Sequence, residues 1–207
     1  MDTSVWTMLQ LFIAVGIWFG FFLAVEHLGE QPLAVVNIIR SVSNISFMMF
    51  SAFATVTSSL VSNLIGAGHS DQVLKLIRRT AGLAFIGSGA FLVIFALFPN
   101  PILRIFTDSA VLIDATRETM YAIVINTMIQ TGAYIVYNAV SGTGNTRVAL
   151  LIELIATVVY GVAIYIVVIV LRSSVALCWL CDSTYALTIG LASFLYLWSG
   201  RWKNRRV

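Results

Sequence analysis

The sequence predicts an all-α integral membrane protein with six membrane-spanning helices. Only 10% of its 207 residues are charged, 59% are hydrophobic, and the mean hydropathy is +0.95. A soluble domain carries roughly 25% charged residues, so this composition excludes an ordinary soluble protein. Backbone groups in lipid must be hydrogen-bonded within the chain, and no segment alternates like a barrel strand. Helices are therefore expected throughout.

Runs that lack charge define the helices in chain order. A spanning helix needs about 20 mostly apolar residues. Four runs contain no Asp, Glu, Lys or Arg, and two further runs contain one acidic residue each, Glu153 and Asp182. The first run is too long and too aromatic for a cleaved signal peptide, so it is expected to stay in the membrane. We predict one membrane lobe over residues 1–207, with spans at about 4–27, 32–65, 80–98, 118–140, 147–171 and 174–199.

Basic residues are distributed unevenly between the two sides of these spans. The connections after the second, fourth and sixth spans carry Lys75, Arg78, Arg79, Arg147, Arg201, Lys203, Arg205 and Arg206. The opposite connections carry Arg104, Arg117 and Arg172. The positive-inside rule therefore predicts that both termini are in the cytoplasm. We expect a multi-pass protein of the cell inner (plasma) membrane.

The connection "LIGAGHSDQVLKLIRR" after the second span is polar and basic. Gly66 and Gly68 can adopt the left-handed conformation that ends a helix, and Ser70 or Asp71 can cap the next helix. That helix carries three basic residues on one face: Lys75, Arg78 and Arg79. Two interpretations stay open, a basic amphipathic helix at the headgroup level and a positively charged loop that follows the topology rule.

Ionisable residues inside a membrane are costly and are candidates for function. Arg40 and Asp182 each lie about eight residues into a span from the same side, or about 12 Å deep. Their matching depth suggests an ion pair, either as a structural clamp or as a charge relay that gates a cavity. Asn44, Asn126 and Gln130 can join them, as hydrogen-bonding groups between helices or as cavity lining.

Glu153 enters from the other side and lies about six residues into the fifth span. A carboxyl group at this position can bind and release a proton, which makes Glu153 and Asp182 the candidates for ion coupling. The alternative for Glu153 is a side chain that extends to the headgroups or meets Arg147.

No enzyme signature is present in the sequence. We find no phosphate-binding glycine loop, no His/Cys metal cluster and no nucleophile elbow, so neither a catalytic residue nor a metal nor a cofactor is expected. The basic tail "GRWKNRR" is expected to face anionic membrane lipid rather than nucleic acid.

Three stretches together resemble one family of secondary transporters. A long helix rich in small residues leads into "LIGAGHSDQVLKLIRR", and "ILRIFTDSAVL" and "AVSGTGNTRVALLIEL" follow. Their order and spacing resemble the C-terminal six-helix lobe of the multidrug and toxic compound extrusion (MATE) family, over almost the whole chain. The most specific part is "GEQPLAVVNIIRSVSNISFMMFSAFATVTSSLVSNLIGAG".

The resemblance implies a transport function that needs a second lobe. Family members have twelve spans in two lobes, and the substrate passes between the lobes. It implies a lobe of a multidrug efflux antiporter, coupled to H⁺ or Na⁺, that exports amphipathic, cationic small molecules by alternating access. The partner would be a complementary N-terminal six-helix lobe or a second chain. The chain would then be a fragment, a truncated gene product or a half-transporter.

Two other functions stay open. A lipid-linked oligosaccharide flippase of the same superfamily is expected to line its cavity with more basic residues than Arg40 alone. A truncated gene can also produce a membrane scaffold that does not transport. The sequence departs from the family at one site, since some members carry acidic residues at positions that fall on Ala14 and near Gln130. A sodium site of that kind is therefore not expected in this lobe.

Overall fold

The computed structural model describes residues 30–202 without a gap, and ten residues before them: 8, 12, 15, 16, 19–21, 23, 25 and 26. Every regular element in these residues is helical, which confirms the all-α fold class. The predicted first span at 4–27 lies in part outside the described residues, as do Ala14 and both ends of the chain.

Five of the described helices are long and apolar enough to cross a membrane. They are α2 (Glu30–Gly66), α3 (Val73–Leu97), α5 (Ala110–Gly142), α6 (Thr146–Ile164) and α7 (Val175–Trp198). A 3₁₀ turn (Ser70–Gln72) precedes α3, a short helix α4 (Pro99–Leu103) follows it, and a π-helical stretch (Tyr165–Val170) extends α6. These helices match the second to sixth predicted spans in order and in type.

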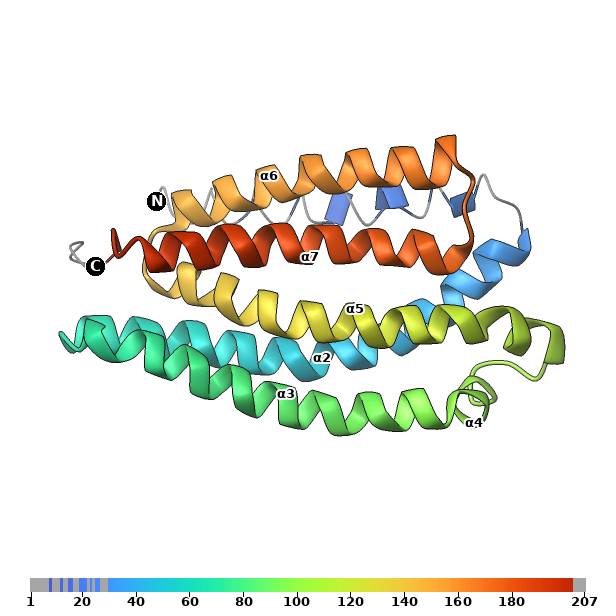
Figure 1. Ribbon diagram of the computed structural model, residues 1–207, viewed down its shortest axis with the longest axis horizontal. Coiled ribbons are helices and arrows are strands. Elements are labelled where there is room, and N and C mark those ends of the chain that lie inside the picture. The colour runs from blue at the N-terminus through green and yellow to red at the C-terminus, as the bar shows by residue number, and fades with distance from the viewer. Residues whose placement is uncertain are drawn as a thin grey trace.

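The long helices lie side by side along the long axis of the molecule (Figure 1). α5 is central, because it packs against α2, α3 and α7, and α6 packs against α7. The α2–α3 turn, the α5–α6 turn and the end of α7 gather at one end of the bundle (Figure 1). The described members of the basic group, Lys75, Arg78, Arg79, Arg147 and Arg201, therefore share one end. That this end faces the cytoplasm stays a prediction.

The turn after α2 is a Schellman motif centred on Gly68. Gly68 has a φ of 77°, and its N–H donates to the carbonyl of Ile65 at 3.0 Å. The next N–H, of His69, donates to the carbonyl of Leu64 at 2.8 Å. These two bonds satisfy carbonyl groups at the end of α2. The left-handed glycine was predicted from the sequence, whereas Gly66 is the last helical residue of α2.

Two helices begin earlier than the spans that we predicted. α3 starts at Val73 rather than near residue 80, because Val73, Ile77 and Ala84 form one continuous buried face. The basic side chains Lys75 and Arg79 are exposed in the first turns of this helix, so they belong neither to a separate headgroup helix nor to a loop. No side-chain capping bond is formed by the residues that flank the 3₁₀ turn, so Ser70 and Asp71 do not act as the predicted cap.

α5 likewise begins at Ala110 rather than near residue 118. Its first turns carry charged residues that our search for apolar runs excluded from a span. Buried Ile113 and Thr116 continue the inward face of the helix through this charged part. A rule based on charge alone therefore detects the apolar part of a helix and misses its ends.

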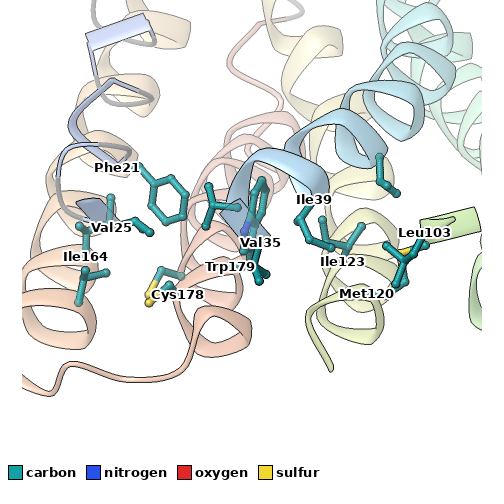
Figure 2. Packing of buried hydrophobic residues seen from close by; sticks show 14 of the residues in the cluster. Phe21, Val25, Val35, Ile39, Leu103, Met120, Ile123, Ile164, Cys178 and Trp179 are labelled. Atoms are coloured by element: carbon teal, nitrogen blue, oxygen red, sulfur yellow. The ribbon is translucent and has the colours of Figure 1, made fainter. Parts of the chain in front are cut away.

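One cluster of buried apolar residues packs around Trp179 (Figure 2). Val35 and Ile39 come from α2, Met120 and Ile123 from α5, and Cys178 and Trp179 from α7. Phe21 packs edge-to-face on Trp179 with ring centroids 5.6 Å apart. The cluster holds the Trp179 indole in place, and Trp179 also lines the cavity that is described next.

Candidate functional site

A cavity of about 260 Å³ lies between α2, α5, α6 and α7. Its lining combines polar and aromatic side chains. The lining residues are Ser43, Asn44, Phe47, Asn126, Thr127, Gln130, Tyr134, Tyr160, Trp179, Asp182 and Tyr185. Four of the six site residues that the sequence predicted thus come together here: Asn44, Asn126, Gln130 and Asp182.

Asp182 is the acidic residue of this cavity, and its side chain is only 8% exposed. Asn126 Nδ2 donates to Asp182 Oδ2 at 3.0 Å, and Gln130 Nε2 donates to the same oxygen at 2.5 Å. Asn126 and Gln130 are four residues apart, so one face of α5 presents both amides to α7. Two hydrogen bonds partly offset the cost of burying this carboxylate.

A third bond fixes the orientation of the Asn126 amide. Ser183 Oγ donates to Asn126 Oδ1 at 2.9 Å, so the amide nitrogen is directed to Asp182. Two consecutive residues of α7 therefore hold one amide of α5. This network makes the relative position of α5 and α7 specific at the cavity.

Aromatic rings form much of the remaining wall. Tyr134 packs against Phe47 with centroids 6.0 Å apart and against Phe50 at 5.3 Å. Tyr160 packs against Tyr185 at 5.8 Å. The faces of such rings attract cations through their quadrupoles. Carboxylate and rings together therefore suit a positively charged, partly apolar molecule.

Glu153 lies behind the wall of the cavity rather than in it. It is 3% exposed, and the Tyr185 hydroxyl donates a hydrogen bond to Glu153 Oε1. Tyr185 also lines the cavity, so one side chain connects Glu153 to it. Arg147, six residues earlier on α6, is exposed. Burial of Glu153 inside the bundle argues against the interpretation that it extends to the headgroups.

Arg40, the expected ion-pair partner of Asp182, is exposed on α2. The hydrogen bonds that the structure gives to the Asp182 carboxylate come from the Asn126 and Gln130 amides instead. Counting residues along a span gives depth, but it does not give the direction in which a side chain leaves the helix. Arg40 lies one turn before Asn44 on α2, and its role beside the cavity stays a prediction.

Sequence reasoning missed the tyrosines and the tryptophan of the wall. A signal was present, since Tyr134 follows Gln130 by four residues, and Trp179 and Tyr185 flank Asp182 at three residues on either side. Side chains at these spacings share a helix face. Our sequence analysis did not test the register of the aromatic residues with the polar residues of the spans.

α2 carries a second feature that the sequence analysis overlooked, an exposed or half-exposed polar face along the helix. Its members recur at intervals of three, four or seven residues, so they follow one face of the helix. We name these residues the α2 polar stripe: Asn37, Ser41, Asn44, Ser51, Thr55, Ser59 and Ser62. Several of their hydroxyls bond the carbonyl four residues earlier, such as Thr55 to Ser51 at 2.9 Å.

Potential metal ligands do not gather in the described part of the chain. Among those residues, no group of three or more His, Cys, Asp or Glu side chains could hold a metal ion. The cavity itself presents one carboxylate, amide groups and aromatic rings.

Comparison with known proteins identifies the family. The MatE family model matches residues 7–172. A probable multidrug resistance protein NorM of Thermotoga maritima is 27% identical over 184 residues, which are 86% of this chain and 39% of that protein. The chain therefore spans less than half the length of this relative.

Solved structures share the fold at low sequence identity. A crystal structure of MATE in complex with MaD3S has a TM-score of 0.85 and 16% identity, over 96% of this chain and 45% of that one. A MOP superfamily transporter from Pyrococcus furiosus, for which reverse polarity of the binding pocket suggests a different function, has a TM-score of 0.75 and 18% identity. That match covers 99% of this chain and 45% of the other. The chain belongs to the MatE family, whose members are membrane transporters and not enzymes.

Proposed function

We propose that this chain is one lobe of an ion-coupled efflux antiporter that exports amphipathic organic cations by alternating access. The single observation that carries the proposal is the cavity, in which a buried carboxylate is surrounded by aromatic side chains. A carboxylate attracts a cation strongly where water is excluded, and aromatic rings add cation–π attraction and apolar contact. The similarity to a protein named for multidrug resistance supports drug efflux as the activity.

The sign of the charge in the cavity favours the exporter over the flippase alternative. The described lining contains the acidic Asp182 and no Lys or Arg. A lipid-linked oligosaccharide carries anionic phosphate groups, which basic side chains bind best. An acidic cavity repels such a headgroup and attracts a cation.

The α2 polar stripe supports a second lobe as the partner. A single hydroxyl that bonds its own helix backbone can remain in lipid. Polar groups that follow one whole face of a membrane helix, with two amides among them, are instead expected to face other protein or a water-filled cavity. The stripe includes Asn44, which also lines the cavity. We therefore propose that α2 borders the transport path between this lobe and a complementary six-helix N-terminal lobe or a second chain.

The same proposal specifies the membrane that holds the protein and the ion that drives export. The protein would lie in the inner (plasma) membrane, with the basic end of the bundle in the cytoplasm. H⁺ or Na⁺ would drive export, with Glu153 and Asp182 as the residues that couple it. Membrane lipid and the second lobe are the proposed partners.

Transport in drug-sensitive cells tests this function. Three samples are compared: the chain alone, the chain together with an N-terminal MATE lobe, and the Asp182→Asn variant of the chain together with the same lobe. The cellular accumulation of ethidium, an aromatic cation, is measured in each. We expect reduced accumulation only when both lobes are present, and loss of this effect with Asp182→Asn. Asp114→Asn, an exposed acid outside the cavity, is the matched control and should transport normally.

Two results would contradict the proposal in different ways. Normal export by Asp182→Asn would remove the cavity carboxylate from the mechanism. Absence of export with any complementary lobe, at normal protein levels in the membrane, would favour a scaffold that does not transport.

A further inference from the structure

We infer that the cavity selects organic cations that carry N–H groups over cations that carry none. Protonated primary and secondary amines form the first class, and quaternary ammonium and phosphonium ions form the second. The acceptors are the Oδ1 atom of Asp182 and the hydroxyl oxygen of Ser43. The inference rests on the proposed function, because it narrows the substrate class of the same cavity. Its test compares two cations of equal charge, so it can fail while the proposed function holds.

The Asp182 carboxylate keeps one of its two oxygen atoms available for a ligand. Asn126 Nδ2 and Gln130 Nε2 both donate to Oδ2, at 3.0 Å and 2.5 Å. Oδ1 accepts no hydrogen bond from the described residues, and Asp182 lines the cavity. Each carboxylate oxygen has about two lone-pair sites that accept hydrogen bonds. The two amides therefore hold the carboxylate in one orientation and leave Oδ1 as an acceptor.

Ser43 supplies a second acceptor, from α2. It lines the cavity, and its buried Oγ atom has no hydrogen-bond partner among the described residues. Other hydroxyls of α2 bond their own helix, since Ser41 Oγ donates to the Asn37 carbonyl at 3.2 Å and Thr57 Oγ1 donates to the Phe53 carbonyl at 2.7 Å. A buried hydroxyl without a partner costs free energy. A ligand that bonds Ser43 removes this cost.

An N–H group on the ligand suits both of these oxygen atoms. A carboxylate can only accept hydrogen bonds, and a serine oxygen accepts through its lone pairs. An N–H on a cation forms a charge-assisted bond with a carboxylate, roughly twice as strong as a bond between neutral groups. A quaternary cation presents alkyl or aryl groups to the same oxygens and leaves both unsatisfied. It keeps only its attraction to the negative charge and to the rings.

The size of the cavity limits the ligand that one lobe can hold. Its volume is about 260 Å³, which is below the roughly 300–1,000 Å³ of pockets for drug-sized molecules. Its walls include the rings of Tyr134, Tyr160 and Trp179. The cavity therefore suits the charged end of a larger molecule or a small aromatic ammonium ion. A small ion of this kind is the appropriate probe.

Binding of two matched probes to the purified full chain in lipid nanodiscs tests the inference. The probes are 1-naphthylmethylammonium and its N,N,N-trimethyl derivative, which share the ring and a single positive charge and differ in their N–H groups. Calorimetry at one neutral pH measures both affinities. We expect the wild-type chain to bind the first probe more tightly, by a factor on the order of ten. Equal affinities for the two probes would overturn the inference.

The variant Ser43→Ala tests the contribution of the hydroxyl. It should weaken binding of 1-naphthylmethylammonium on the order of fivefold and leave binding of the trimethyl derivative unchanged. Ser46→Ala is the matched control, because Ser46 lies on the same helix and also has a buried Oγ without a partner among the described residues, but it does not line the cavity. Full preference in Ser43→Ala, or an equal loss in Ser46→Ala, would contradict the role of Ser43.

The variant Asp182→Asn separates this inference from the proposed function. It removes the negative charge, so it should weaken binding of both probes. Undiminished binding of both by Asp182→Asn, or no binding of either probe by the wild-type chain, would count against the proposed function and against the inference that rests on it. Weaker binding of both by Asp182→Asn, with equal affinities in the wild-type chain, would contradict the inference alone.

Discussion

At the scale of single residues, the cavity depends on the way α5 amides hold the Asp182 carboxylate. Asn126 is the most constrained of these groups, because it bonds both Asp182 and Ser183 on α7. Its amide can satisfy both partners in one orientation only. This makes Asn126 the residue whose loss should reveal the network most clearly.

We predict that Asn126→Ala lowers the free energy of unfolding in detergent by about 1–3 kcal/mol, because a buried carboxylate and a hydroxyl each lose a partner. Asn138→Ala is the matched control on the same helix, since Asn138 bonds only its local backbone among the bonds described, at Tyr134 O and 2.9 Å. Thermal or denaturant unfolding followed by circular dichroism measures both. Equal losses for the two variants would mean that the network adds nothing to stability.

Sequence reasoning found the polar members of the site because polar groups are rare in a membrane span. Asn126, Gln130 and Asp182 stood out for that reason, and their similar depth predicted that they meet. The direction of Arg40 and the position of Glu153 behind Tyr185 could not be predicted, because both depend on how each helix is rotated about its axis. That rotation is set by packing against neighbouring helices, which one sequence does not specify.

At the scale of the helices, small residues permit close contacts between α2 and α5. A Cβ atom at Gly142 would lie 2.5 Å from the Ser58 carbonyl oxygen and 3.0 Å from Val61 Cβ. Ser62 Oγ donates to the Gly142 carbonyl at 2.8 Å across the same contact. α2 and α5 therefore approach each other backbone to backbone at the end of the bundle that carries the turns.

We predict that Gly142→Ala destabilises the chain by about 1–3 kcal/mol, since the added methyl group forces the two helices apart. Gly161→Ala in α6 is the control, because its Cβ would meet no atom within 4 Å. The melting temperature in detergent measures the difference. A Gly142→Ala variant as stable as Gly161→Ala would show that α2 and α5 can separate at little cost.

The α2–α3 turn allows a test of backbone conformation separate from packing. Gly68 has a positive φ, whereas Gly66 is helical, and a Cβ at either residue meets no atom within 4 Å. We predict that Gly68→Ala costs about 1–2 kcal/mol of stability, the price of a left-handed conformation in a residue with a Cβ. Gly66→Ala should be neutral or slightly stabilising. The melting temperature in detergent measures both effects. A Gly68→Ala variant as stable as the wild-type chain would contradict the Schellman turn.

The sequence predicted the middle of each described membrane helix better than its ends. Apolar runs predicted the order, the number and the middle of the five described membrane helices, because lipid imposes the same requirement on each of them. They missed the charged first turns of α3 and α5, which extend the helices past the apolar region. Buried positions such as Val73 and Ile113 continue through those turns, so periodicity rather than charge would have predicted them.

At the scale of the whole molecule, the α2 polar stripe is the surface that should border an aqueous transport path between this lobe and a second lobe. We predict that cysteines placed at Thr55 and Ser59 react with a charged, water-soluble thiol reagent when both lobes are present. Cysteines at Val56 and Leu60, exposed apolar residues on another face of α2, are the controls and should react slowly. The native cysteines, which are buried, are replaced by alanine.

Reaction rates in membranes measure this difference. Similar rates at all four positions would mean that the stripe does not border an aqueous path. The stripe could not be assigned to an interface from composition, because Ser and Thr hydroxyls can bond their own helix backbone and so remain in lipid. Its register along one face of a 37-residue helix makes the assignment possible.

The central claim is that this lobe binds organic cations through the Asp182 carboxylate. Equilibrium binding of tetraphenylphosphonium to the purified chain in nanodiscs, at one fixed neutral pH, tests it most directly. The account predicts saturable binding by the wild-type chain and by Asp114→Asn, and affinity weaker on the order of tenfold, or about 1.4 kcal/mol, in Asp182→Asn. Equal affinity in Asp182→Asn and the wild-type chain would contradict it.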